Sequence, residues 1–230
     1  MVEYINTPLF GIALTLVVFS VSNFIYNKFK NPILNPIAIS IIVIISFLKF
    51  TGIDVGIYQK GGSIISFFLG PATVALAIPI YRRLNLLKDN IVPILISVFI
   101  GSLVGIISIV ILSKVLLVDD LILLSLIPKS TTSAIAIDIS KEVGGSPALT
   151  IVFVMATGIL GNMIGPSILK IFKINNKKAK GLALGSASHV VGTEKAIELG
   201  ETEGAISSIA ISVAGIITVF LAPLIVKIIM

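Results

Sequence analysis

A lysine lies within a stretch that is otherwise apolar enough to cross a membrane. Lys129 follows Pro128 in the run 121–137. Four hydroxyl-bearing residues come directly after it: Ser130, Thr131, Thr132 and Ser133. A lysine at the bilayer centre costs roughly 2.5–3.5 kcal/mol on insertion scales, and such residues usually face a cavity or a ligand. Residues 134–142 predict a half-helix whose N-terminus would present free N–H groups to the same place.

This combination of a cation, hydroxyls and a helix N-terminus favours the binding of a small organic anion. The alternative is that the long side chain of Lys129 extends to the membrane interface, where its ammonium group would be hydrated.

The single histidine of the chain lies in a second polar stretch. Ser186, His189 and Thr193 are spaced i, i+3, i+7, which predicts that they share one face of a helix. Together with Ser188 they would line the wall opposite Lys129. A buried histidine that titrates near neutral pH could relay a proton, and the alternative is a histidine that is hydrogen-bonded for structural reasons.

Other polar residues are weaker candidates. Asn162 lies between Gly161 and Gly165 and predicts a hydrogen bond between helices, or less directly a ligand contact. An acidic stripe, at i, i+4, i+7, consists of Glu194, Glu198 and Glu201. Such a stripe is usually a solvated face, although Glu198 could bind a coupling ion. Asp138 is a further coupling candidate, but it lies nine residues after Lys129, too far along a helix to pair with it directly.

Several kinds of chemistry are not supported by the residues present. The chain has no cysteine and one histidine, which excludes thiolate chemistry and a histidine-rich metal site within one chain. There is no P-loop, and adjacent residues such as Lys129 and Ser130 do not face each other on a helix. We therefore expect no enzyme, no metal and no cofactor, although a proton or a sodium ion could be coupled to function.

The composition is that of a membrane protein. The 230 residues are 56% hydrophobic and 12% charged, against about 25% charged in soluble domains, and the mean hydropathy is +1.13. So few charges could not cover a soluble surface. This excludes a soluble enzyme, a disordered chain and a nucleic-acid binder despite the net charge of +6. The basic residues are instead markers of topology in an all-α polytopic protein of the cytoplasmic membrane.

Eight apolar segments are long enough to be considered as membrane helices, which need about 20 residues each. They are roughly Pro8–Tyr26, Pro32–Leu48, Gly62–Tyr81, Ile91–Ser113, Leu121–Ile137, Gly144–Leu169, Gly181–Thr193 and Gly204–Val226. The first lacks a basic n-region and a small-residue cleavage site, so we expect it to be a retained helix. The third is interrupted by Gly70-Pro71, which predicts a kink. The fifth and seventh carry the polar stretches described above, and unwound backbone at membrane depth requires a protein or water-lined environment.

Three basic loops constrain the topology. They contain Lys28 and Lys30, then Arg82, Arg83 and Lys88, and finally Lys170, Lys173, Lys177, Lys178 and Lys180. Eight simple crossings cannot place all three loops in the cytoplasm. Either one loop departs from the rule or one segment is re-entrant. The fifth segment, which is broken midway and polar at the break, is the best candidate, and the sequence does not decide between the fifth and the seventh. If the seventh segment crosses, the acidic loop 201–203 is outside and Lys227 is inside.

A spacing of 57 residues recurs along the chain. It separates Pro36 from Pro93, Pro71 from Pro128 and Lys170 from Lys227. We therefore predict one membrane domain over residues 1–230 with pseudo-repeat halves of about 1–117 and 118–230. Interrupted helices in both halves favour inverted repeats and an elevator-like carrier.

Several short motifs, mainly in the C-terminal half, resemble the LrgB/CidB family of bacterial membrane proteins. They are Pro128–Ala136, Gly144–Thr150, Thr157–Gly161 with Gly165-Pro166, Gly181–Thr193 and Gly200–Ala205, with a looser match at Leu69–Ala77. Family members often have other residues around Val190–Lys195, so Glu194 and Lys195 are not assigned a family role.

The resemblance implies two functions. One is transport of small monocarboxylates, since plastid relatives move glycolate and glycerate and some bacterial members are linked to pyruvate. The other is antiholin-like control of murein hydrolase activity and cell lysis, together with a small LrgA/CidA-like membrane partner. We expect a secondary transporter of pyruvate- or glycolate-like anions, with the antiholin-like regulator as the alternative. A homodimer in the lipid bilayer is compatible with both.

Overall fold

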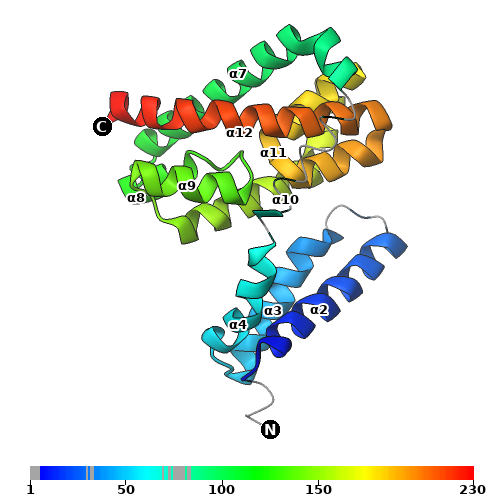
Figure 1. The fold of residues 1–230 in the computed structure, drawn as a ribbon, viewed down its shortest axis with the longest axis vertical. Coiled ribbons are helices and arrows are strands. Elements are labelled where there is room, and N and C mark those ends of the chain that lie inside the picture. Colours follow the sequence, from blue (N-terminus) through cyan, green and yellow to red (C-terminus); the bar gives the residue numbers. More distant parts are fainter. Residues whose placement is uncertain are drawn as a thin grey trace. The chain divides into compact units, whose positions relative to one another are not determined.

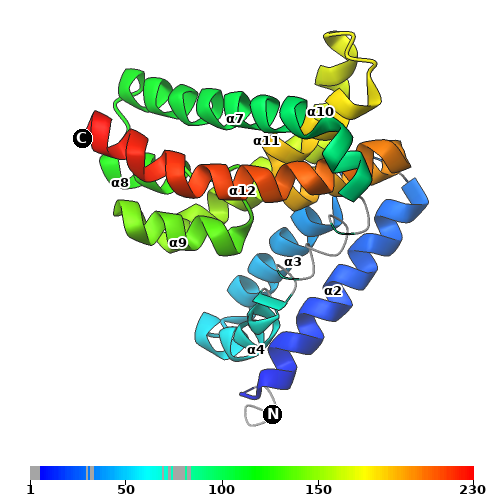
Figure 2. The ribbon, with the colours of Figure 1, turned by 45° about the horizontal axis from the view of Figure 1, so that its top comes forward.

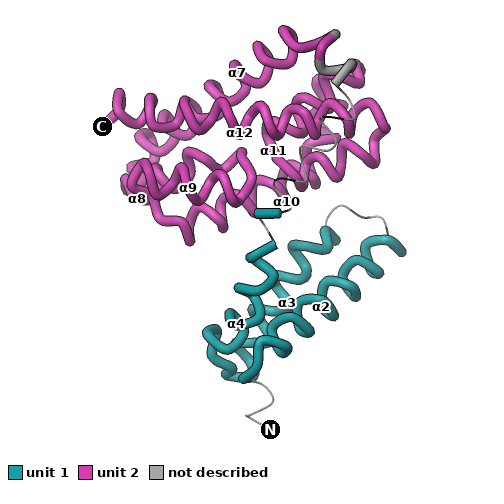
Figure 3. The backbone as a smooth tube through the Cα atoms, in the orientation of Figure 1, with its two compact units in different colours: residues 1–75 teal, residues 76–230 magenta. Residues whose placement is uncertain are grey.

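The computed structural model describes residues 6–29, 31, 34–68, 70–71, 74, 81 and 84–230. Within these ranges the chain forms helices and turns and contains no strand. It divides into two compact units, residues 1–75 and 76–230, which are coloured separately in Figure 3. We describe each unit by itself.

The first unit contains α2 (Pro8–Phe29), α3 (Pro36–Thr51) and α4 (Val55–Phe67). Local signals set the helix ends. Asn35 caps α3 by accepting hydrogen bonds from the N–H groups of residues 37 and 38, and Gly52 ends it in the left-handed conformation (φ +67°). Helices at the first two predicted segments are thereby confirmed.

Helices α2 and α4 cross where two glycines meet. A Cβ atom added to Gly11 would collide with the carbonyl oxygen of Tyr58, and one added to Gly61 would collide with the backbone of α2. The third predicted segment begins within α4. Most of its remainder lies outside the described residues, and so does most of the looser motif of residues 69–77. The basic residues Lys30, Arg82 and Arg83 also lie outside them.

The second unit contains six helical elements, drawn in Figure 1. They are α7 (Leu84–Val115), α8 (Asp120–Leu126), α9 (Ser133–Val143), α10 (Pro147–Ile171), α11 (Lys177–Leu199) and α12 (Glu201–Ile229). Helix α7 is kinked at Asn90 (φ −132°). In the described part of the chain, four helices are long and apolar enough to cross a membrane: α2, α7 from Asn90 onward, α10 and α12. The chain is a multi-pass protein of the cell membrane.

Helices α7 and α12 lie alongside each other and run in the same direction (Figure 2). Ile94 and Val98, early in α7, pack against Ile206 and Ala210, early in α12. Farther along, the residues in contact are Ile106, Ile109 and Val110 of α7 and Leu221 and Ala222 of α12. The starts of both helices therefore lie at one end of the unit, which we call end A, and their C-termini lie at the opposite end B.

Helices α8 and α9 form a hairpin that enters and leaves at the same end. The backbone N–H of Ser146 donates to Oγ of Ser125 at 2.8 Å, 21 residues earlier. Because the chain returns to the level of α8, the segment cannot cross the unit. It enters from end B, after α7, and turns back at residues 127–132. The re-entrant fifth segment is thereby confirmed, and we call residues 120–143 hairpin 1.

Helix α11 is also a hairpin, although its hydrogen-bonding pattern continues through a break. Ser188 (φ −133°, ψ 19°) and His189 (φ 43°, ψ −134°) are not helical. A Cβ added to Gly192 would collide with the carbonyl oxygen of Leu184. Residues eight apart in a continuous helix are about 12 Å apart along its axis, so the two arms must fold back on each other. We call residues 177–199 hairpin 2.

Hairpin 2 enters from end A. Lys178 Nζ donates to Oδ1 of Asn90, at the start of α7, at 2.7 Å. A Cβ on Gly181 would meet the backbone of Glu203, at the start of α12. Helix α10 connects the two hairpins, since it starts beside Ser125 and its Leu169 packs against Leu184 of hairpin 2. The second unit therefore contains two inverted repeats, each made of one long helix followed by one hairpin.

The 57-residue spacing reappears in this inverted pair. Helix α10 starts 57 residues after Asn90 of α7, and α11 starts 57 residues after α8. The spacing thus relates residues 90–143 to residues 147–199. The pseudo-repeat halves 1–117 and 118–230 stay a prediction.

The location of the acidic loop differs from the expectation based on a crossing seventh segment. Because segment 7 turns back on itself, the loop 201–203 lies at end A, together with Lys88 and the lysines of residues 170–180. Lys227 lies at end B. From the positive-inside rule we expect end A to be cytoplasmic, in which case hairpin 1 enters from the outside and hairpin 2 from the cytoplasm.

Candidate functional site

The tips of the two hairpins meet beside Lys129. A cavity of about 300 Å³ lies between α7, α12 and the tips, and we call it the polar cavity. A second space of about 420 Å³ lies along α10 and is lined mostly by apolar side chains, and we call it the apolar groove. Lys129, Ala183 and Ala187 line both spaces. Lys129 therefore lies at the boundary between a hydroxyl-rich and an apolar compartment.

Hydroxyl groups from four elements converge on the polar cavity. They belong to Ser102 of α7, Ser130 of hairpin 1, Ser186 of hairpin 2 and Thr218 of α12. Gly101 and Gly105 of α7 also line it, and no atom lies within 4 Å of the position of a Cβ added to Gly105. The two glycines have the spacing of a helix-packing motif, but here they line the cavity and leave space in it.

Lys129 has no counter-ion among the described residues. Its Nζ donates to Oγ of Ser130 at 3.3 Å, and no carboxylate oxygen of the described chain lies within 4.0 Å of it. An ammonium group removed from water without an anion is unfavourable. At the predicted anion site, the described residues therefore provide no negative charge to balance the ammonium group of Lys129.

The four hydroxyls that follow Lys129 have different surroundings. Ser130 accepts the hydrogen bond from Lys129. Thr131 is 1% exposed and donates to the carbonyl oxygen of Pro128 at 2.9 Å. Thr132 is the N-cap residue of α9, but its buried Oγ1 has no hydrogen-bond partner in the part of the chain that the structure describes. Ser133, the first residue of α9, is half-buried.

A network of buried hydroxyls holds the base of hairpin 1 and thereby positions Lys129. Thr150 Oγ1 lies 2.7 Å from Oγ of Ser140 and donates to the carbonyl oxygen of Ser125 at 3.0 Å. All three residues are fully buried. The sequence does not mark these residues, because Ser125 and Thr150 are single polar residues in apolar stretches and Ser140 is one of several polar residues near the end of α9.

The residues expected on one face of the seventh segment are separated by the break. Ser186 lines the polar cavity and Ser188 lines the apolar groove. Thr193 lies on the returning arm, where its Oγ1 is 2.6 Å from Oγ of Ser207 in α12. The prediction of a shared face was wrong because it assumed an uninterrupted helix through residue 189.

His189 forms the tip of hairpin 2. It is 3% exposed, its Nε2 lies 2.8 Å from the carbonyl oxygen of Val154 in α10, and it does not line either cavity. A positive φ of 43° is uncommon for a residue with a side chain and costs on the order of 1–3 kcal/mol. The side chain thus anchors a strained turn to α10 in this conformation.

Helix α10 carries three glycines that allow hairpin 2 to approach closely. A Cβ on Gly158 would meet Cε1 of His189 at 2.6 Å, and one on Gly165 would meet Leu184 at 2.8 Å. A Cβ on Gly161 would overlap Ser188. The stripe at i, i+3, i+7 is therefore the contact face for the tip and the first arm of hairpin 2.

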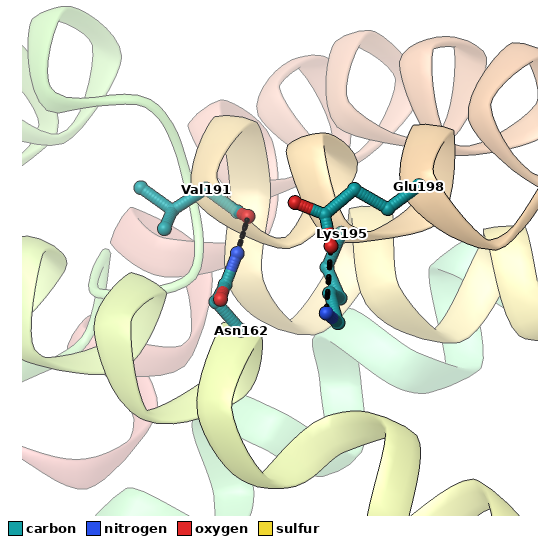
Figure 4. A network of polar contacts seen from close by, with 4 residues as sticks. All are labelled: Asn162, Val191, Lys195 and Glu198. Carbon is teal, nitrogen blue, oxygen red and sulfur yellow. Dashed lines mark hydrogen bonds and ion pairs between the residues drawn. The ribbon is translucent and has the colours of Figure 1, made fainter. Parts of the chain in front are cut away.

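Asn162 connects α10 to the returning arm of hairpin 2. Its Nδ2 donates to the carbonyl oxygen of Val191 at 2.9 Å, as Figure 4 shows. This confirms the predicted hydrogen bond between helices. The same view shows Lys195 Nζ bound to Oε2 of Glu198 at 2.7 Å.

Among the coupling candidates, Glu198 is engaged by Lys195, and the side chain of Asp138 is 83% exposed and lies 3.9 Å from Lys141. Neither residue lines the polar cavity or the apolar groove. The acidic stripe is not continuous, because Gly200 separates α11 from Glu201 at the start of α12. A coupling role for His189, Glu198 or Asp138 stays a prediction.

Comparisons with known proteins agree on one family. The family described as LrgB-like matches residues 15–228. The chain is 37% identical to the antiholin-like protein LrgB of Bacillus subtilis (strain 168) over 228 residues, which is 99% of each chain. It is also 37% identical to the protein of that name in Bacillus cereus (strain B4264), over 95% of each chain. No solved structure matches the chain.

Proposed function

The chain belongs to the LrgB-like family, and we propose that it is a secondary carrier of small monocarboxylates rather than an enzyme. The observation that carries this proposal is the meeting of two oppositely inserted hairpin tips at Lys129, an unpaired lysine between two cavities. Inverted repeats with broken helices at mid-membrane are typical of carriers, and the half-helix N-termini there point at anionic groups of the substrate.

The charges favour a monoanion as the substrate. Within the described residues the two cavities are lined by one cation, Lys129, and by no carboxylate. The hydroxyl of Ser130, which accepts from Lys129, can donate to a carboxylate, and the hydroxyl of Ser186, which donates to the carbonyl oxygen of Leu182, can accept from a 2-hydroxy group. The apolar groove accommodates a short carbon chain. Glycolate- and pyruvate-like acids have this combination of groups.

The arrangement of the hairpins supports alternating access. Hairpin 1 covers the site from end B, and hairpin 2 covers it from the cytoplasmic end A. Movement of the tip of hairpin 2 away from Lys129 would open the site toward end A, while hairpin 1, which carries Lys129, keeps it closed toward end B. Such a movement would separate the strained turn at His189 from the glycine face of α10. A proton or a sodium ion could be coupled to the movement.

A second candidate function is the antiholin-like control of murein hydrolase activity and lysis. It is favoured by the relatives, which match nearly the whole chain and are named antiholin-like proteins. In this role the protein would act with a small LrgA/CidA-like membrane partner. Such a regulator needs packing faces, but it has no need for polar groups that converge at mid-membrane.

The test is uptake of labelled pyruvate and glycolate into proteoliposomes under proton and sodium gradients. We expect uptake by the wild-type protein and a loss of at least tenfold in Lys129→Ala, because the one cation that lines the cavities among the described residues is removed. Lys141→Ala is the matched control, since Lys141 is exposed and forms only a loose pair with Asp138. Absence of uptake of any small acid would reject the carrier and leave the regulator.

A further inference from the structure

Ser102 of α7 lines the polar cavity, and its hydroxyl has no hydrogen-bond partner among the described residues. We propose that this hydroxyl donates a hydrogen bond to the oxygen atom at C2 of the transported acid. The carrier would thereby distinguish 2-oxo and 2-hydroxy acids from monocarboxylates that have no oxygen at C2. The inference rests on the proposed carrier function, and it assigns a residue to the second polar group of the substrate rather than to its carboxylate.

Ser102 interrupts the apolar stripe that α7 buries within the second unit. It is 9% exposed, and the other buried residues of this helix from 94 to 110 are Ile94, Val98, Ile106, Ile109 and Val110. Ser102 lies 12 residues after Asn90 and 13 residues before Val115, which are the ends of the apolar span. The hydroxyl is therefore near the middle of the membrane-spanning part of α7, where burial of a polar group without a partner is unfavourable.

The hydroxyl of Ser102 is not satisfied by its own helix. Serines within helices commonly donate to a carbonyl oxygen of the preceding turn, as Ser108 of α7 does to Gly105 at 2.8 Å. Ser102 makes no such bond in the part of the chain that the structure describes. The one sealed side-chain polar atom without a partner in that part is Oγ1 of Thr132, so Oγ of Ser102 keeps accessible surface. An unpaired hydroxyl that is accessible within a cavity is available to a ligand.

The other hydroxyls of the polar cavity are already engaged. Ser186 and Thr218 donate to carbonyl oxygens four residues earlier in their own helices, at 2.6 and 2.7 Å. Ser130 accepts from the ammonium group of Lys129, so its proton is placed to reach a carboxylate that the same charge attracts. Ser102 is then the hydroxyl that can donate to an oxygen of the substrate other than the carboxylate.

Ser186 can assist Ser102 when the substrate carries a hydroxyl group. Its Oγ lies 3.8 Å from the position of a Cβ added to Gly101, the residue before Ser102, so hairpin 2 brings it against the same part of α7. Because its proton is donated to Leu182, this oxygen accepts but does not donate. A 2-hydroxy group can therefore accept from Ser102 and donate to Ser186, whereas a 2-oxo group can only accept from Ser102.

The experiment compares acids that share a three-carbon chain and differ at C2. Propionate has no oxygen there, lactate has a hydroxyl group and pyruvate has a keto group, and all three are anions at neutral pH. The thermal unfolding midpoint of the full-length protein in detergent is measured against the concentration of each acid, with sodium chloride as the reference. We expect the half-maximal shift of the wild type at about fivefold less pyruvate than propionate, the effect of one hydrogen bond to a neutral group.

Substitutions separate the two serines. Ser102→Ala should raise the half-maximal concentrations of pyruvate and lactate about fivefold and leave that of propionate unchanged, because only the contact with the oxygen at C2 is lost. Ser102→Thr, which keeps the hydroxyl, should retain the preference for pyruvate over propionate. Ser186→Ala should weaken the response to lactate but not to pyruvate. Ser108→Ala is the control, since this exposed serine of α7 does not line the cavity, and it should change none of the three responses.

Two results would overturn the role of Ser102 and leave the carrier proposal intact. The first is a wild type that responds to pyruvate together with a Ser102→Ala variant that responds equally. The second is an equal loss for all three acids in Ser102→Ala, because the hydroxyl would then support the cavity as a whole, for example through a structural water. If the wild type responds to none of the acids, the carrier proposal fails together with this inference.

Discussion

Gly192 lies against the carbonyl oxygen of Leu184, eight residues earlier in the same helical element. This contact defines hairpin 2, because a straight helix would separate the two residues by about 12 Å. It also explains the glycine, since any Cβ at this position would collide with the first arm. Together with the contact of Ser146 with Ser125 in hairpin 1, it makes the second unit an inverted pair of re-entrant hairpins.

The sidedness of both hairpins can be tested by labelling single cysteines in a chain that has no native cysteine. We expect residues 120 and 142, at the base of hairpin 1, to react from one side of the membrane. Residues 177 and 201, at the base of hairpin 2, should react from the other, cytoplasmic side. All four positions are exposed. Opposite-side labelling within either pair would show that the segment crosses the membrane.

The contact between α10 and hairpin 2 should be sensitive to one added methyl group. Gly161→Ala should destabilise the protein by about 1–3 kcal/mol, the usual effect of overpacking, because its Cβ would overlap Ser188. Gly105→Ala has open space around its Cβ and should leave stability unchanged. Thermal unfolding in detergent measures both, and equal midpoints for the two variants would contradict the close approach of the hairpin tip.

The backbone at His189 should prefer glycine to alanine. His189→Ala and His189→Gly both lose the hydrogen bond to Val154, but only glycine adopts a φ of 43° without strain. We expect the glycine variant to be more stable than the alanine variant by about 1 kcal/mol. A comparison of their unfolding midpoints checks this, and a more stable alanine variant would mean that the turn relaxes to an ordinary conformation.

The hydroxyl network at the base of hairpin 1 should contribute to stability. Thr150→Val keeps the shape of the side chain but leaves the Ser125 carbonyl and the Ser140 hydroxyl without this partner. We expect a loss of about 1–3 kcal/mol in the free energy of unfolding. Thr51→Val, at an exposed helix end where the hydroxyl bonds within its own helix, is the control and should change stability little.

Much of the fold could be predicted from the residues alone. Long uncharged runs predicted the membrane helices, because about 20 apolar residues are needed to cross a bilayer. The lysine-rich loops favoured a segment that turns back, and the break at Pro128-Lys129 made the fifth segment the best candidate, whereas the structure turns back the seventh segment as well. The recurring spacing of 57 residues anticipated a repeat, since related segments keep their length when they fold in the same way.

Other features depended on contacts between segments far apart in the sequence. The polar stretch of the seventh segment indicated a break in the helix, but not that the chain reverses there, which follows from the close approach of Gly192 to Leu184. Because of this reversal, Thr193 contacts Ser207 in α12 rather than the predicted site, and His189 contacts Val154 in α10.

The sequence by itself determined that this is a membrane protein with a lysine among hydroxyls, because charge and hydropathy act locally. The tertiary structure decided which of those hydroxyls are already hydrogen-bonded. Thr131 and Thr132 are adjacent threonines that the sequence does not distinguish. In the folded chain the hydroxyl of Thr131 donates to Pro128, whereas that of Thr132 has no partner among the described residues.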